Sequence, residues 1–302
     1  MIISTTLKVM LSWNVTNKNN HTVQQARIKA ALTKKNLQTK RIKNWQEKPQ
    51  HGAYLRQLSE NGADVKASVG WLKNCFLDPF SEAYVCAAQE LALFTKYHES
   101  KILHTHNDST CRICRDKNSD ETIYHILAGC DSLAKREYFV RHNAICKYLH
   151  FVISKAYNQP CGKNWYTHEP KEVITGKNVD ILYDQVLHTD QEVGANRPDL
   201  VIKDKNTRKA YIIDVSCPCD LNIYKMEATK VAKYVGLRGQ LQKMWGYNCV
   251  TIPIIVGGLG AVTTNVKDYL AQIPGLPKLV MCQKIALLGS KKILTDVLSR
   301  RR

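Results

Sequence analysis

The sequence predicts an α/β protein in which a basic helical region and a small CCHC metal-binding module precede an α/β domain. Three observations predict this fold class. Helical periodicity dominates the first half of the chain, apolar strands alternate with helices after residue 165, and a cluster of cysteine and histidine residues lies between these two parts. We therefore expect a helical region over residues 1–103, the metal-binding module with its following helix over 104–160, and the α/β domain over 165–302.

The first half of the chain contains three expected helices. Residues 23–37 are rich in lysine and poor in aromatic residues, so they form either a basic helix or a mobile arm. Residues 81–101 carry apolar side chains at helical spacing, and so do residues 133–154. The stretch 156–170 contains two prolines and a glycine and is typical of a linker or a long loop.

After residue 170 the pattern changes to short apolar runs separated by helices. The second and third runs flank the turn-like Asn206-Thr207 and are expected to pair as a hairpin. Strands are expected at residues 181–187, 199–203, 210–216 and 250–256. Helices are expected at residues 226–245, 267–273 and 279–298.

The net charge of +18 predicts a nucleic-acid partner, DNA and also RNA, because a basic excess favours binding to polyanions. The alternative is a basic surface that has no partner. No apolar run approaches the ~18 residues of a membrane span, and no secretory signal is found. We therefore expect no membrane partner and an intracellular location, nuclear or cytoplasmic. There the eleven cysteines are expected as thiols or metal ligands rather than disulfides.

Four of these residues have the spacing C-x2-C-x10-H-x4-C. Two pairs of soft or borderline ligands with a polar loop between them are typical of a structural zinc site, since four protein ligands leave no open position. His104 or His106 is near enough in sequence to replace one ligand. The expected zinc ligands are Cys111, Cys114, His125 and Cys130. Cys217 and Cys219 are too closely spaced for such a pair and are expected as buried or edge thiols.

Two aspartates in the second half predict a site for a hard cation. Asp199 precedes one apolar strand and Asp214 lies at the end of the next, so a hairpin brings both carboxylates to one end of the sheet. Such a pair suits magnesium, which polarises a phosphodiester and orients hydroxide. The following helix carries lysines that complete the site by neutralising charge in the transition state. The alternative is that both residues are ordinary strand-end acids.

The order of these motifs resembles a known protein family. The CCHC cluster, RPDLVI, YIIDV and a K-x2-K-Y helix are similar to the C-terminal region of non-LTR retrotransposon reverse transcriptase polyproteins. These carry a restriction-like endonuclease of the PD-(D/E)xK type. The resemblance extends over most of the chain. It implies a restriction-endonuclease-like domain that nicks target DNA to prime reverse transcription, with possible association with the element RNA.

The resemblance also implies roles for individual residues. Asp199 and Asp214 carry over as metal-binding, catalytic acids. Many such nucleases have a lysine two residues after the second acid, but Ser216 stands there, so Lys230 on the next helix is the best match, before Lys225 and Lys233. Basic residues expected to contact nucleic acid are Arg141, His142 and Arg197.

The sequence contains no polymerase motif, which leaves three functions open. The first is a metal-dependent DNA endonuclease fragment of a retrotransposon polyprotein. The second is a catalytically inactive remnant that binds nucleic acid. The third is a domesticated zinc-knuckle protein that uses the helical face over residues 87–97 for protein contacts.

Overall fold

The computed structural model describes residues 3–48, 52–116 and 118–300. Within the first helix it describes the side chains of residues 22–45 only. It divides into two compact units, residues 1–53 and 54–302. The first unit holds the helix α1 (Ile3–Gln46), whose side chains at residues 22–44 are exposed. The basic helix expected over residues 23–37 is therefore confirmed as part of a longer helix.

The second unit is a mixed α/β structure with a five-stranded sheet, as expected at the level of fold class. Its strands follow one another in the order of the sequence: β1 (Val173–Thr175), β2 (Val179–Tyr183), β3 (Leu200–Asp204), β4 (Lys209–Ser216) and β5 (Asn248–Ile255). The first four strands are antiparallel, and β5 runs parallel to β4. The expected hairpin of β3 and β4 is confirmed, whereas the three-residue β1 was too short to show a pattern in the sequence.

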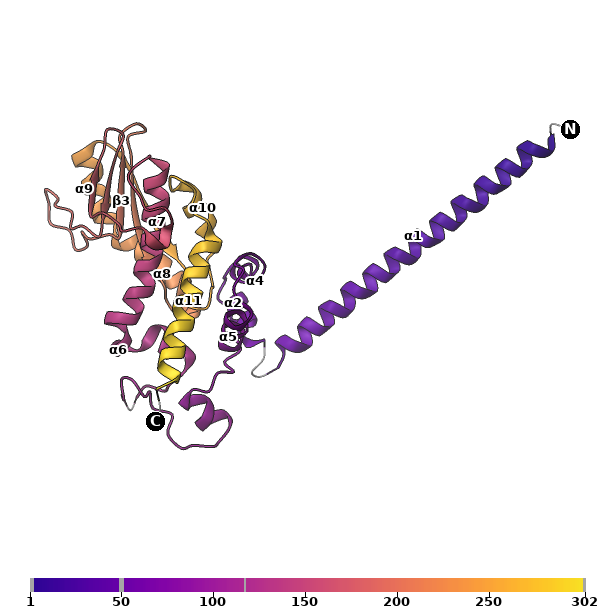
Figure 1. The fold of residues 1–302 in the computed structure, drawn as a ribbon, viewed down its shortest axis with the longest axis horizontal. Coiled ribbons are helices and arrows are strands. Elements are labelled where there is room, and N and C mark those ends of the chain that lie inside the picture. The colour runs from indigo at the N-terminus through magenta and orange to yellow at the C-terminus, as the bar shows by residue number, and fades with distance from the viewer. Residues whose placement is uncertain (1–2, 49–51, 117, 301–302) are drawn as a thin grey trace. The chain divides into compact units, whose positions relative to one another are not determined.

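Helices surround this sheet in the second unit. The α-helices are α2 (Ala53–Glu60), α3 (Val65–Ser68), α4 (Trp71–Asn74), α5 (Pro79–Gln89), α6 (Asp131–Leu133), α7 (Phe139–Ala156), α8 (Ile223–Lys233), α9 (Val235–Trp245), α10 (Val266–Gln272) and α11 (Leu279–Leu298). Short π-helical turns lie at His98–Ile102, His125–Gly129 and Ala134–Tyr138, and 3-10 turns at Trp165–Thr167 and Asp220–Asn222. Within this unit, α7 and α9 lie on opposite sides of the sheet (Figure 1).

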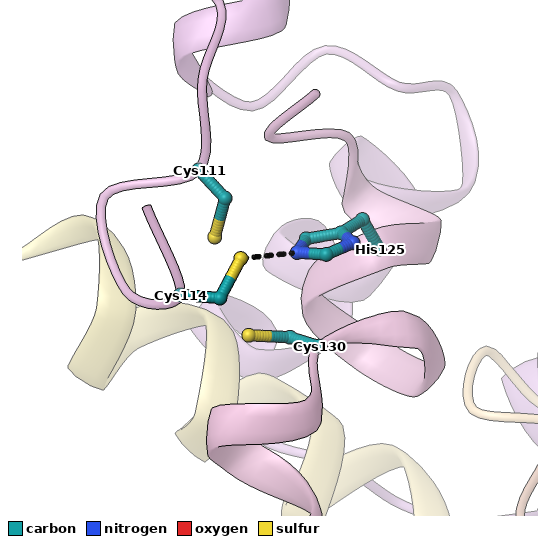
Figure 2. Close-up of side chains that lie close together, drawn as sticks. All are labelled: Cys111, Cys114, His125 and Cys130. Atoms are coloured by element: carbon teal, nitrogen blue, oxygen red, sulfur yellow. Dashed lines mark hydrogen bonds between the residues drawn. The ribbon is translucent and has the colours of Figure 1, made fainter. Parts of the chain in front are cut away.

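Residues 104–130 are held by turns rather than by long helices. An isolated bridge pairs Thr110 with Asp120, and the cysteine and histidine cluster of Figure 2 lies beside it. Two of the cluster's cysteines belong to a core that also contains Ile255 of β5 and Ile293 of α11. The module therefore shares a core with the α/β part, and the two compact units do not coincide with the three segments expected from the sequence.

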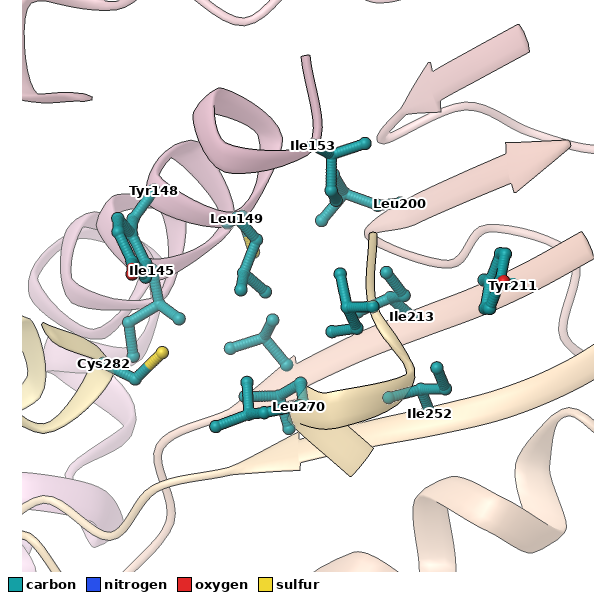
Figure 3. Packing of buried hydrophobic residues seen from close by; sticks show 14 of the residues in the cluster. Ile145, Tyr148, Leu149, Ile153, Leu200, Tyr211, Ile213, Ile252, Leu270 and Cys282 are labelled. Carbon is teal, nitrogen blue, oxygen red and sulfur yellow. The ribbon is translucent and has the colours of Figure 1, made fainter. Parts of the chain in front are cut away.

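The largest core lies between the sheet and the helices α7, α10 and α11. Ile145, Leu149 and Ile153 recur every four residues and form one apolar stripe of α7. This stripe faces alternate residues of the strands, including Leu200 and Ile213, whose side chains point to one face of the pleated sheet (Figure 3). The opposite face of β3 and β4 packs against α9.

Several helix boundaries differ from those expected. α5 begins at Pro79 because the Asp78 carboxylate accepts a hydrogen bond from Ser81 N at 2.9 Å, and the helix ends at Gln89, before Leu91 adopts a positive φ of 55°. The helix expected over residues 226–245 is two helices separated at Tyr234. By contrast, α11 has the expected bounds.

The stretch expected as a linker or a long loop is a loop with one 3-10 turn, and it packs against the protein rather than linking two parts. Within residues 156–170, Trp165 makes an edge-to-face contact with Tyr148, and His168 is buried against His150. These aromatic contacts attach the segment to α7, because each ring removes apolar surface from water.

Candidate functional site

The four expected metal ligands converge in space. Cys111 and Cys114 lie on the loop closed by the Thr110–Asp120 bridge, His125 begins a π-helical turn, and Cys130 precedes α6. Their four ligand atoms all lie within 4.8 Å of one another, and Cys114 Sγ is 3.4 Å from His125 Nε2 (Figure 2). Neither His104 nor His106 belongs to this group. The cluster therefore has the donor atoms and the spacing to bind one metal ion.

The surrounding polar contacts hold the cluster in place. Glu121 is fully buried and forms a two-pronged pair with Arg112, at 2.8 Å to Nε and 2.7 Å to Nη2. The same carboxylate accepts the backbone N–H groups of Arg112 and Lys96. Arg112 also donates to the carbonyl of Leu298 at the end of α11. This buried pair fixes the first cysteine loop against the C-terminal helix.

The electrostatic environment of the cluster favours neutral ligands. Burial lowers the pKa of His125, and burial together with Cys111 and Cys114 raises the pKa of Cys130 to about 12. Neutral imidazole is the form that binds metal, whereas the thiols must lose their protons when a metal ion binds.

The two aspartates lie where the hairpin predicted them. Leu200 of β3 pairs with Ile213 of β4 in the antiparallel register. The next position beyond this pair sets Asp199 opposite Asp214. Asp214 is 2% exposed, whereas the side chain of Asp199 is 20% exposed. The pair therefore lies at one end of the central strands, with one carboxylate buried and the other reachable from solvent.

Asp214 is surrounded by groups from the end of α8 and the start of α9. Lys230 Nζ lies 2.5 Å from Oδ2, and Lys233 Nζ lies 3.4 Å from Oδ1. The Tyr234 hydroxyl donates to Oδ1 at 2.5 Å, and burial with the Asp214 contact raises the pKa of Tyr234 strongly. Lys230 makes an ion pair without hydrogen-bond geometry, so the buried Oδ2 receives no hydrogen bond from the described residues.

Asp199 contacts the opposite side of the hairpin end. Its Oδ2 accepts Val215 N at 2.6 Å and lies 3.1 Å from His142 Nε2 on α7. Burial lowers the pKa of His142, but the hydrogen bond and charge of Asp199 outweigh it, so the pKa is raised overall. Cys146, one helical turn after His142, completes this group.

Arg141 corrects one expectation. It is 2% exposed, and its guanidinium donates to Ser290 Oγ, Leu127 O and Cys217 O. Gly289 makes room for it, because a Cβ there would lie 2.7 Å from Arg141 Cγ. Arg141 therefore stabilises the packing of α7 on α11, and its charge is not presented to a nucleic acid.

The other predicted residues remain accessible. The side chain of Arg197 is 58% exposed and pairs with both carboxylate oxygens of Asp184, at 2.8 and 3.0 Å. Lys225 is exposed on α8, on the N-terminal side of the two lysines that reach Asp214. Cys217 and Cys219 are half-buried free thiols.

Sequence reasoning missed Tyr234 and Cys146. Both had a local signal. Tyr234 follows Lys233 directly, and Cys146 lies four residues after His142, a spacing that places two helical side chains on one face.

None of the described helices combines the length and the apolarity that crossing a bilayer requires. No protein-family model matches the chain, and no curated protein matches it significantly.

Proposed function

We propose that this chain is a magnesium-dependent endonuclease that hydrolyses phosphodiester bonds in DNA. One observation carries the proposal: the register of the β3–β4 hairpin sets two aspartates opposite each other, and Lys230 of the following helix lies 2.5 Å from one of them, Asp214. Burying the charged carboxylate of Asp214 costs free energy, which an ion pair or a bound cation can offset. Such a charged group in the interior is a candidate for a functional site.

In this proposal each residue of the site has its own role in the reaction. Asp199 and Asp214 would hold magnesium, for which the buried Asp214 Oδ2 retains a lone pair without a hydrogen-bond donor. Magnesium would polarise the phosphodiester and favour ionisation of the attacking water. Lys230 neutralises the charge that develops on the phosphate oxygens. Tyr234 orients the Asp214 carboxylate through its hydroxyl.

We also propose that the Cys111, Cys114, His125 and Cys130 cluster binds zinc in a structural role, because it brings together the four protein ligands that structural zinc takes. The resemblance described above suggests a wider context. There the chain corresponds to the C-terminal nuclease region of a non-LTR retrotransposon polyprotein, with a restriction-endonuclease-like fold, and nicks target DNA to prime reverse transcription. The net charge of +18 supports DNA and RNA as partners.

The test is nicking of supercoiled plasmid DNA with and without magnesium. Asp199→Asn and Asp214→Asn keep the shape of the side chains, and the exposed Asp190→Asn serves as the matched control. We expect both site variants to lose at least about 100-fold in rate, while Asp190→Asn cuts normally. DNA affinity should change little, because phosphate contacts elsewhere carry it. Wild-type nicking rates in both site variants would exclude the assignment.

A second function is favoured by the same contacts. Lys230 and Lys233 already neutralise Asp214, which is also the arrangement of an inactive protein that only binds nucleic acid. That alternative predicts salt-dependent DNA binding by the wild-type protein with no nicking at any magnesium concentration.

A further inference from the structure

The second cluster of metal-binding side chains lies on the α7 side of Asp199. His142, Cys146 and Asp199 each offer one ligand atom, and these three atoms lie within 4.8 Å of one another. His142 and Cys146 occupy successive turns of α7, and Asp199 reaches them from the start of β3. An imidazole, a thiol and a single carboxylate are donors for borderline metal ions rather than for magnesium.

The distances between these atoms suit a common metal ion. For a tetrahedral ion with bonds of about 2.0–2.3 Å, neighbouring ligand atoms lie about 3.3–3.8 Å apart. Here Nε2 is 3.1 Å from Asp199 Oδ2, and Cys146 Sγ is 3.7 Å from His142 Nδ1 and 3.9 Å from Nε2. A rotation of the imidazole, so that Nε2 faces both the thiolate and the carboxylate, is therefore needed to form a site.

The hydrogen bonds of His142 supply an independent argument. Its Nδ1 lies 3.0 Å from Asn143 Oδ1, an acceptor, to which the ring donates in the tautomer that carries the proton on Nδ1. In the neutral ring Nε2 then carries a lone pair and faces the carboxylate of Asp199, which is also an acceptor. Two acceptors at this distance need a positive charge between them, supplied either by a second ring proton or by a metal ion.

There is also space for an ion. A small pocket of about 30 Å³ is lined by the three ligand residues together with Tyr183 and Asp184, and a space of this size holds a water molecule or an ion. Asp184 also lines this pocket, and its carboxylate pairs with Arg197. Three protein ligands leave a fourth position open to solvent, in contrast to the complete Cys111–Cys130 cluster.

We propose that His142, Cys146 and Asp199 bind a second divalent metal ion of the zinc class. Because Asp199 would serve both this ion and magnesium, zinc bound here withdraws the carboxylate from the nuclease site. This regulatory consequence rests on the proposed function, whereas binding itself does not.

The first experiment measures zinc content after equilibrium dialysis of the full chain against micromolar zinc. The wild type should hold about two equivalents, whereas Cys146→Ser and His142→Gln should each hold about one, bound at the four-ligand cluster. Cys282→Ser, a fully buried cysteine of the same core, is the matched control and should retain about two. Circular dichroism checks that each variant is folded.

Two outcomes would overturn the proposal. One is a wild-type protein that binds only one equivalent of zinc, as expected if His142 and Asp199 form a simple ion pair. The other is a folded Cys146→Ser protein that keeps both equivalents.

A second experiment tests the regulation. Zinc should inhibit magnesium-dependent nicking, and Cys146→Ser should raise the zinc concentration needed by at least about tenfold. If no nicking is observed at all, the proposed function fails while the zinc measurement still decides the binding site.

Discussion

Two lysines contact the Asp214 carboxylate, and they differ in the oxygen that they approach, in distance and in exposure. Lys230 is 2.5 Å from Oδ2 and its side chain is 19% exposed, whereas Lys233 is 3.4 Å from Oδ1 and 38% exposed. Oδ1 already accepts the Tyr234 hydroxyl, and Lys233 donates to that hydroxyl at 2.8 Å. Lys230 is therefore the lysine that pairs with Oδ2, and Lys233 mainly supports Tyr234.

This difference predicts an order of effects on cleavage. Lys230→Ala should slow single-turnover nicking by about 100-fold, because the developing charge loses its nearest ammonium group, and Lys233→Ala by less than about 10-fold. DNA dissociation constants, measured in parallel, should change less than the rates. The exposed Lys225→Ala is the control on the same helix. A larger effect of Lys233→Ala would reverse the assignment.

At the scale of elements, the cysteine and histidine module joins loops that have little secondary structure of their own. A structural metal site can contribute on the order of 10 kcal/mol to a small module. Here part of the cluster also lies in a shared core with α11, which holds the module by apolar contacts as well. Loss of the metal should therefore loosen the loops before it unfolds the whole unit.

We expect Cys114→Ser to lower the zinc content by about one equivalent and to speed hydrogen exchange over residues 110–130. The exposed Cys161→Ser should change neither quantity. Mass spectrometry of the intact protein and of its exchanged peptides measures both. An unchanged zinc content in Cys114→Ser would remove the zinc assignment.

A buried histidine pair attaches residues 162–168 to α7. Gly162 N donates to His168 Nδ1 at 3.2 Å, so His168 Nε2 carries the proton and donates to His150 Nδ1 at 2.7 Å. Burial and the nearby His168 lower the pKa of His150 to about 4, and burial also lowers the pKa of His168. Both rings are neutral in the folded protein, because a second proton would set two N–H groups against each other.

The pair predicts loss of stability in acid. Unfolded histidine titrates near about 6.5, so between that pH and about 4 the unfolded chain binds protons that folded His150 does not. The stabilisation is complete above pH ~6.5 and falls by up to about 3 kcal/mol as the pH drops to ~4. His150→Gln should weaken the dependence of stability on pH between about 4 and 6.5, whereas the exposed His188→Gln should not. Urea unfolding at several pH values measures the free energy of unfolding. The prediction would be contradicted if this free energy depended on pH in the same way for the wild type and His150→Gln.

At the scale of the whole molecule, the net charge of +18 predicts salt-dependent association with DNA. Each neutralised phosphate contributes about −0.9 to the slope of log affinity against log salt. We expect a slope of several such units, and a slope smaller by about one unit in Arg197→Gln. Titrations over a range of salt concentrations measure both. A flat response would mean that the basic surface has no polyanion partner.

Local patterns in the sequence determined much of this protein. Apolar periodicity predicted the bounds of α11, and the lysine-rich composition of residues 23–37 gave a basic helix as one of two alternatives. The short turn at Asn206-Thr207 predicted the hairpin that sets Asp199 opposite Asp214. The spacing of the four cluster ligands predicted their convergence. These features depend on residues close together in the chain, where backbone geometry alone limits the arrangements.

Other features were decided only by tertiary packing. The charge of Arg141 suggested an exposed contact, but Gly289, far along the chain, makes room to bury it. The proximity of Cys146 to Asp199 depends on α7 lying on the sheet, and the shared core of the module with α11 depends on residues more than a hundred positions apart. A helical or strand period says which face of an element is apolar, but not which distant element covers it, because that choice depends on the shape and volume of the whole core.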